Sequence, residues 1–580
     1  MLRVSVAISL CTLVFWIAGC GLEEPGTFDP NLLQSPYRAG AQNDQTEPLR
    51  PLPTGREPAY PSDVTAAEAA TQPAPTTGPS LGSESTITLS LQDIIHRAIV
   101  NNHDIRAAGY QPAIDAARVV EAEAHFDPEL FSDVDWEHKH EPDAGELFTD
   151  PITQALIRSN FTASDTMTTD IGIKQTTPSG TQLQLDDKDS FNYNYPRLYT
   201  LDPFFENQLT LQVTQPLLKD FGVEVNEART VIARDNQKIS TLDFRKQIED
   251  TLDKIEKAYW QLVQSQADVK YQEQLLDITQ QTWNVLYQRF LNHVDVTDLE
   301  LAQAQTSLEL RRTTLIDAKQ RARSFSDTLR QLMADPSLPV SKDILIIPAD
   351  KPTTEPIEFN VQEQIDSALD NRLELTEQLD KIDIAAVTAK VAENNLLPEL
   401  DFVGQVGSEG LGANEGDAIG RQAIFRDVDY GLGIKFDYFL GNREARAIWK
   451  RTLLARMQAI ETYRGAIDQV TADVMTASRQ ITSAWEQMVS TRLARDQAQK
   501  ALDAYQARQD SGVPLTPEFV NTKLDIQDRL ASAEQEEDRA TASYNIAIEQ
   551  LEKAKGTLLR YNNVLLEENP NLFTGKDYLH

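Results

Sequence analysis

Four long segments of the sequence carry apolar or small residues at every seventh position. They are residues 226–291, 296–333, 443–510 and 516–560. In the third segment the repeat runs through Ile460, Ile467, Val474, Ile481 and Met488. This heptad spacing is typical of helices that wrap around one another, and the many small residues permit close packing. A helix of roughly 65 residues is about 100 Å long, so we expect long paired helices in place of a single rounded core.

A second periodicity interrupts these helices. In Val428–Phe439, the sequence VDYGLGIKFDYF, apolar residues alternate with polar residues or glycines. A period of two is the signature of a β-strand with one apolar and one polar face. The same alternation follows Pro128 and Pro398 and precedes Pro216. Because proline interrupts a helix and pushes the preceding residue out of the helical region, we interpret these prolines as helix–strand junctions and expect four strands.

The chain also contains two halves with the same layout. Each begins with an amphipathic stretch, continues through an Asn pair or Asp-Asn into an alanine-rich helix, and reaches a proline. Asn101 and Asn102 thus correspond to Asp370 and Asn371. The two copies are much longer than a solenoid repeat, so the pattern predicts the duplication of a whole subdomain.

The halves differ between their outgoing and returning strands. In the second half the connection is short and glycine-rich, and we interpret Gly407, Gly410 and Gly412 as part of a turn. In the first half the connection is long and contains a predicted hairpin near 165–190 that turns at Pro178–Gly180. This hairpin either projects into the extracellular space or adds a pair of strands to the sheet, and we favour the extracellular position.

Composition narrows the possible partners and chemistry. The formal net charge is −35, which argues against nucleic acid because phosphates would be repelled. The sequence contains no phosphate-binding loop, no paired cysteine sets and no nucleophile–base arrangement, so we expect neither a cofactor nor catalysis. His138 and His140 share one strand face, but we interpret this pair as a solvated strand end or loop rather than as a metal site.

The N-terminus predicts export and lipidation. Arg3 precedes a mostly apolar run from Val4 to Ile17, which is too short for a comfortable transmembrane helix and suits a signal peptide. The run ends at Ala18-Gly19-Cys20, which resembles the lipobox of bacterial lipoproteins, where the cysteine is acylated. An ordinary signal peptide with a chance cysteine is the alternative. Residues 21–84 are rich in Pro, Thr, Ala and Gly, so we interpret them as a tether.

Four amphipathic strands require a medium that accepts their apolar face. An apolar face of about ten residues is long enough to cross a bilayer at a tilt. Strands from one chain cannot close a useful pore, and open sheet edges are not tolerated in lipid. We therefore expect strands from several chains to close one barrel around a polar lumen. A lipid-anchored coiled-coil scaffold without a pore is the alternative, but it has no use for lipid-facing strands.

The order of these features resembles the TolC-type outer-membrane efflux proteins. The resemblance rests on the lipobox, the duplicated openings, the proline junctions, and the stretches QPLLKDFG, AYWQLV and QRFLNHVDVTDLELAQAQ. It implies a mostly α fold with membrane β-strands, in which a homotrimer forms a 12-stranded outer-membrane β-barrel and a long coiled-coil α-barrel in the periplasm. The implied function is a duct for efflux or secretion. The implied partners are a periplasmic adaptor, an inner-membrane transporter and outer-membrane lipid.

The resemblance also divides the chain into segments. We expect a signal peptide at 1–19, a lipid-anchored tether at 20–85, a first efflux repeat at 86–335, a linker at 336–360, a second repeat at 361–565 and a tail at 566–580.

In the same family the tips of the helical hairpins carry the gate and the adaptor contacts. The expected constriction residues are Asp298, Glu518 and Asn521. The expected adaptor contacts are Arg289, Phe290, His293, Arg508 and Gly512. The sequence departs from the family pattern at Asn292-His293, where a glycine is expected, and at Asn521, where a second aspartate is expected. Solvated tip charges are the alternative interpretation of Asp298 and Glu518.

Overall fold

The computed structural model describes most of the chain beyond the N-terminal segment. The described residues are 85–142, 147–158, 161–196, 199–292, 296–511 and 517–564. The chain divides into two compact units, Met1–Gly82 and Ser83–His580, and every described residue belongs to the second. The predicted signal peptide, the lipidation site Cys20, all but the last residue of the tether and the tail at 566–580 lie outside the described residues.

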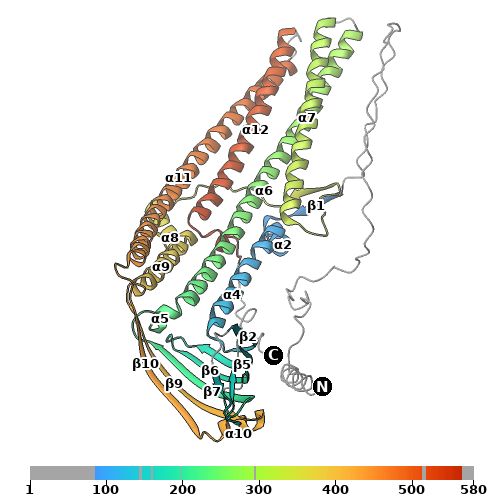
Figure 1. The fold of residues 1–580 in the computed structure, drawn as a ribbon. Coiled ribbons are helices and arrows are strands. Elements are labelled where there is room, and N and C mark those ends of the chain that lie inside the picture. Colours follow the sequence, from blue (N-terminus) through green and yellow to red (C-terminus); the bar gives the residue numbers. More distant parts are fainter. Residues whose placement is uncertain are drawn as a thin grey trace, which may run out of the picture. The chain divides into compact units, whose positions relative to one another are not determined.

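Two long helical hairpins dominate the second unit (Figure 1). Helices α6 (Ala228–Leu291) and α7 (Asp298–Met333) form the first hairpin, and α11 (Arg443–Asp510) and α12 (Pro517–Ala554) form the second. Helix α12 also packs against α6, so the four helices lie in the order α7, α6, α12, α11. These bounds agree closely with the heptad segments, because the seven-residue repeat specifies one continuous contact stripe on each helix.

Each hairpin is held by its own apolar core. In α6 the core residues Leu252, Ile255 and Tyr259 are 0% exposed and recur at steps of three and four, as one helix face requires. They pack with Leu329 and Met333 of α7. The core of the second hairpin joins residues of α11 to residues of α12. It contains Val470, Val474, Ile481 and Met488 together with Tyr544, Ala547 and Leu551.

Shorter elements complete the helical region. They are β1 (Ser85–Leu89), α2 (Leu91–Asn101), α3 (His103–Ala108), α4 (Tyr110–Glu123), η1 (Ala124–Phe126), α5 (Val223–Asn226), β8 (Ile344–Pro348), α8 (Val361–Asn371), α9 (Leu373–Asn394) and α13 (Leu558–Tyr561). Strands β1 and β8 pair in parallel. Helix α2 begins at a capping box in which Ser90 and Asp93 satisfy each other's backbone N–H groups.

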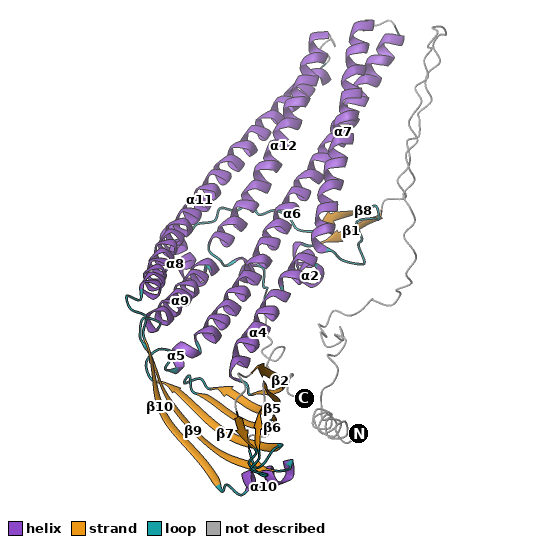
Figure 2. Cartoon of the chain, in the orientation of Figure 1, coloured by secondary structure: helices purple, strands orange, loops and turns teal. Residues whose placement is uncertain are grey.

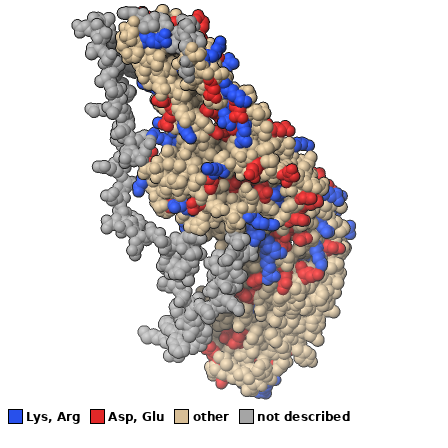
Figure 3. Space-filling model, turned by 180° about the vertical axis from the view of Figure 1, so that it is seen from behind, with Lys and Arg blue, Asp and Glu red and all other residues tan. Residues whose placement is uncertain are grey.

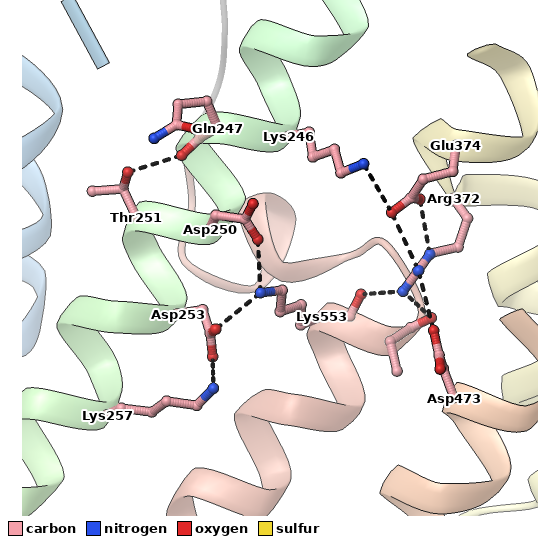
Figure 4. A network of polar contacts seen from close by, with 11 residues as sticks. Lys246, Gln247, Asp250, Thr251, Asp253, Lys257, Arg372, Glu374, Asp473 and Lys553 are labelled. Atoms are coloured by element: carbon pink, nitrogen blue, oxygen red, sulfur yellow. Dashed lines mark hydrogen bonds and ion pairs between the residues drawn. The ribbon is translucent and has the colours of Figure 1, made fainter. Parts of the chain in front are cut away.

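A polar network ties the two halves together (Figure 4). The ammonium of Lys553 on α12 lies 2.8 Å from Asp250 and 2.9 Å from Asp253 of α6. On the other side of this network, the Arg372 guanidinium contacts Glu374 of α9 at 3.0 Å and Asp473 of α11 at 3.3 Å. The side chains of Asp253 and Arg372 are mostly shielded from solvent, at 11% and 15% exposed, and the network links α6 to the second half.

A six-stranded antiparallel sheet follows the helices at one end (Figure 2). Its order is β10-β9-β7-β6-β5-β2. The strands are β2 (Glu129–Pro142), β5 (Phe161–Thr176), β6 (Gln182–Tyr195), β7 (Phe204–Pro216), β9 (Glu399–Gly412) and β10 (Asp427–Asp437). A separate two-stranded sheet, β3 (Leu147–Thr149) with β4 (Leu156–Arg158), lies in the connection from β2 to β5. The pairing of β7 with β9 joins the first half to the second.

The prediction of an extracellular hairpin near 165–190 is wrong. Its two strands are β5 and β6, and they lie inside the sheet between β2 and β7, so the chain contributes six strands where four were expected. The turn lies at the helical end, where Gly222 donates its N–H to the carbonyl of Ser179 at 3.2 Å. Gly180 has φ of 90°, and a Cβ there would collide with the carbonyl oxygen of Asp220, so glycine is required.

The turn predicted from the glycines of the second half is also misplaced. Gly407, Gly410 and Gly412 are strand residues of β9, and a helix, α10 (Glu415–Ala423), follows them. A Cβ at Gly410 would meet the carbonyl of Ala418, so the glycine lets α10 lie directly on the strand. The glycines therefore serve close packing between strand and helix.

Candidate functional site

One face of the sheet is a continuous apolar surface. A single cross-strand row takes one apolar residue from each of the six strands. The row is Tyr430, Val406, Leu211, Leu185, Ile173 and Leu130. All six side chains are exposed, from 42% for Leu211 to 84% for Tyr430. Large apolar side chains left in water at this density are unfavourable, so this face is suited to a non-aqueous medium.

The opposite face of the same strands is polar. The adjacent row again takes one residue from each strand. It is Gly431, Gln405, Gln212, Gln184, Lys174 and Glu129. Lys174 and Glu129 form an ion pair at 3.0 Å, and Asp133 and Asp135 of β2 lie on this face as well. An apolar face backed by a polar face is the arrangement of strands between lipid and an aqueous lumen.

Charged side chains lie mainly over the helices and only sparsely over the sheet. In the view from behind, Lys, Arg, Asp and Glu are spread over the helices, while the part of the surface formed by the sheet carries few of them (Figure 3). The strands are also long enough to cross a membrane, since the six strands have 11 to 16 residues and a membrane-crossing strand needs about 9–11.

Helix α10 covers a polar interruption in the apolar face. Gln422 donates to the carboxylate of Asp187 at 2.6 Å, and the Ser408 hydroxyl donates to the carbonyl of Gln422 at 2.9 Å. Ala418, a residue of α10 that lies against Gly410 of β9, is fully buried. The outward residues of α10 and its C-terminal turn include Ile419, Ile424 and Phe425, which are 43%, 67% and 60% exposed. The helix thus replaces polar strand residues with an apolar outer surface.

The three predicted junction prolines stand at ends of strands. Pro128 and Pro398 each precede the first residue of an outgoing strand, β2 and β9. Pro216 is the last residue of β7, before the chain enters α5 and α6. These positions suit proline because the backbone N–H that it lacks would be unpaired at a strand end.

At the first helical tip, the predicted residues lie on both sides of the turn. Arg289 and Phe290 are half-buried in the last turn of α6, and Asp298 is the exposed first residue of α7. A capping box between Thr297 and Glu300 begins α7. His293 lies outside the described residues.

At the second tip, Glu518 and Asn521 are exposed in the first turns of α12, and Arg508 is exposed in the last turn of α11. Their spacing of three places Glu518 and Asn521 on one helix face. Gly512 lies outside the described residues. The rings of Tyr505 and Phe519 stack at 4.5 Å between their centroids and hold α11 against α12.

The two tips pack against each other through residues other than the predicted gate and adaptor residues. Leu524 of α12 packs on Leu286 and Ala304 of the first hairpin, and Arg311 of α7 pairs with Asp528 of α12. Arg311 follows Ala304 in the heptad repeat, so a charge at a core position was the available signal for an ion pair between the hairpins. The structure therefore joins the tips, but it places Asp298 and Glu518 on separate exposed helix starts.

Three carboxyl groups lie between α6 and α12 in the middle of the helical region. Burial and the neighbouring carboxylates raise the pKa of Glu549, and burial likewise raises the pKa of Glu256. Burial alone would raise the pKa of Asp253, but hydrogen bonds from Lys257 and Lys553 bring it below its usual value. Glu256 and Glu549 are each 1% exposed, so burial disfavours the charged form of both carboxyls when the helices are packed.

The described residues offer no metal centre. Among them, no three His, Cys, Asp or Glu side chains are grouped as metal ligands would be. His138 instead lies 2.7 Å from the carboxylate of Asp165 on the neighbouring strand. A search of the helices in the described part of the chain found none with the length and hydropathy of a membrane span.

Comparisons with known proteins agree with this geometry. A family model described as outer membrane efflux protein matches residues 202–335 and 364–557, which together exceed half of the chain. No curated protein matches the sequence.

Solved structures share the fold. The Campylobacter jejuni CmeC outer membrane channel has a TM-score of 0.55 at 14% identity, covering 81% of this chain and 86% of its own. Vibrio cholerae VceC has a TM-score of 0.55 at 15% identity, covering 80% and 96%. The open state of the Neisseria gonorrhoeae MtrE outer membrane channel has a TM-score of 0.55 at 14% identity, covering 85% and 98%.

Proposed function

Since the chain belongs to the outer membrane efflux protein family and is an outer-membrane channel rather than an enzyme, we propose that it is the channel subunit of a trimeric duct for efflux or secretion. The observation that carries this proposal is the sheet with an exposed apolar row backed by a polar row. Three copies close the sheet edges around a polar lumen, because unpaired strand edges are not tolerated in lipid. The helical hairpins extend the lumen into the periplasm.

The duct is passive, and its partners supply energy and selectivity. We propose that a periplasmic adaptor and an inner-membrane transporter engage the helical tips. Arg289, Phe290, His293, Arg508 and Gly512 are the proposed contacts with the adaptor. Support comes from the position of the described members of this set in the last turns of α6 and α11, where a docking protein can reach them.

Acidic side chains at the tips form the proposed constriction. Asp298 and Glu518 are exposed first-turn residues of α7 and α12, with Asn521 one turn beyond Glu518. In a trimer each position is repeated three times around the axis, so the carboxylates would attract cations to the periplasmic entrance. Acylation at Cys20 adds a lipid anchor, so the protein is held in the outer membrane by both sheet and lipid.

A lipid-anchored scaffold without a pore is the competing function. An exposed apolar row across six strands argues against it, because a scaffold in water gains nothing from such a surface.

The experiment that separates the two is single-channel recording of the purified protein in planar bilayers. We expect trimers that conduct, with larger currents in a Glu518→Ala variant. A trimer that stays silent even with Glu518→Ala and a loosened tip would refute the duct.

A further inference from the structure

We infer that this channel closes an 18-stranded barrel in the outer membrane, with six strands from each of three chains. The inference rests on the proposed trimeric duct and changes its width. A 12-stranded barrel would take four strands from each chain, but the sheet has six. Because barrel diameter grows roughly in proportion to strand number, 18 strands give about 1.5 times the diameter and about twice the cross-section of 12.

Strands β5 and β6 have the same two faces as the other strands of the sheet. Ile173 and Leu185 continue the apolar row that runs from Tyr430 to Leu130. Gln184 and Lys174 continue the polar row beside it. A hairpin outside the membrane would gain nothing from an exposed apolar face in register with its neighbours.

The backbone ladder is continuous through β5 and β6. Strand β5 pairs along all of β2, from Glu129 to Pro142, and β6 pairs along Phe204–Thr214 of β7. Taking β5 and β6 out of the sheet would leave the facing edges of β2 and β7 unpaired, and their N–H and C=O groups could be satisfied in lipid only if β2 and β7 formed a new pairing. The two strands are therefore integral to the sheet that contains β2 here.

The turn between β5 and β6 lies at the helical end of the sheet. Thr177 and Thr181 close the turn, and the carbonyl of Ser179 accepts the N–H of Gly222, next to the start of α5. Asn226 donates to the carbonyl of Asp220 at 2.9 Å in the same connection. Strand β5 thus runs from the far end of the sheet to the helical end, and β6 runs back, so both are full-length strands.

The two edge strands of the sheet run in opposite directions. Within the described sheet, β2 and β10 each have a single neighbour. An even number of antiparallel strands makes β2 and β10 run in opposite directions, so β2 of one copy can pair antiparallel with β10 of the next. The partner that fits each edge is therefore a second copy of this chain, and repeating the pairing three times closes the ring.

The test is to label single cysteines on the hairpin with a maleimide that does not cross membranes. In cells, Leu185→Cys faces lipid and should be labelled at least tenfold more slowly than Asp186→Cys, which faces the lumen. Leu211→Cys and Thr210→Cys on β7 form the matched control pair. An extracellular hairpin would give fast labelling at both Leu185→Cys and Asp186→Cys while the β7 pair still differed, and this result would overturn the inference.

The strand number is read directly from an image of the wild-type trimer in lipid nanodiscs by electron microscopy. We expect 18 strands around the barrel. A conducting trimer with 12 strands would overturn the wide barrel and leave the duct intact. A protein that neither conducts nor closes a ring would refute the proposed function, and the inference with it.

Discussion

The two halves of the chain contain helical hairpins of similar length and differ in the strands that they add to the sheet. Helix α6 has 64 residues and α11 has 68, while α7 has 36 and α12 has 38. By contrast, the first half supplies β2, β5, β6 and β7, and the second supplies β9 and β10 with α10 between them. Packing between long helices tolerates little change in length. The connection between an outgoing and a returning strand is free to vary, and it sets how many strands each half adds.

The largest effect is expected when a charge is placed in the apolar row of either half. Leu185→Lys on β6 and Leu432→Lys on β10 each place an ammonium in lipid, which costs about 2–4 kcal/mol per copy near the bilayer centre. We expect both variants to lose the trimer and fail to reach the outer membrane, measured by native electrophoresis of membrane fractions. Gly433→Lys is the matched control, because its side chain would enter open space on the polar face.

An equal loss of assembly in Leu185→Lys and Leu432→Lys would mean that the added strands of the first half face lipid as the strands of the second half do. If Leu185→Lys assembled as well as Gly433→Lys, then β6 would not face lipid, and the comparison between halves would fail.

A smaller effect is expected where α10 lies on β9. Gly410→Ala forces a methyl group against the Ala418 carbonyl, and relieving the collision should cost about 1–3 kcal/mol. Gly420→Ala within α10 is the control, because its Cβ meets nothing within 4 Å and alanine favours a helix. Thermal unfolding of the purified protein should show a lower midpoint for Gly410→Ala alone. Equal midpoints would mean that α10 does not rest on the strand.

The buried carboxyl of Glu549, between α6 and α12, should make the stability of the protein depend on pH. Because burial and its acidic neighbours raise the pKa of Glu549, the folded state binds its proton more tightly than the unfolded state does. This contribution to stability is complete below the unfolded pKa of about 4.5 and is lost as the pH rises towards the folded pKa. Glu549→Gln removes the titration, so it should stabilise the protein at pH 8 by roughly 2 kcal/mol and have little effect at pH 4.

Chemical denaturation at the two pH values measures the difference. Glu461→Gln, an exposed carboxylate on α11, should change stability equally little at both. A destabilised Glu549→Gln at pH 8 would mean that the carboxylate is charged and needed in the packed helices.

The sequence predicted the shared part of the two halves better than the part that differs. Heptads are local and repeat many times, so one displaced residue does not hide a helix. Strand β6 was harder to place because Asp187 and Asp189 interrupt its apolar face. Asp187 is tolerated there because Gln422 of α10, more than two hundred residues away in sequence, donates a hydrogen bond to it. A pattern completed by a remote helix cannot be recognised from the strand alone.

The tip residues show a related limit. Asp298 and Glu518 were selected by resemblance, and the structure places both at exposed helix starts. The contact between the tips depends on Arg311 and Asp528, which are brought together only when α7 and α12 pack. Spacing along one helix can reveal a charge in an apolar repeat, but it does not identify the partner.

The smallest effect is expected from the two acidic tip residues, one from each half. Asp298→Asn and Glu518→Gln remove exposed carboxylates, so each should change stability by less than about 0.5 kcal/mol. If both carboxylates line the entrance, each variant should lower the cation preference of the channel, because three charges per trimer are lost. Reversal potentials across a salt gradient measure this preference, and Glu461→Gln on the shaft of α11 is the matched loss of charge. A shifted reversal potential in Glu518→Gln alone would assign the constriction to the second half. An unchanged reversal potential in both variants would mean that Asp298 and Glu518 are solvated surface charges that do not line the entrance.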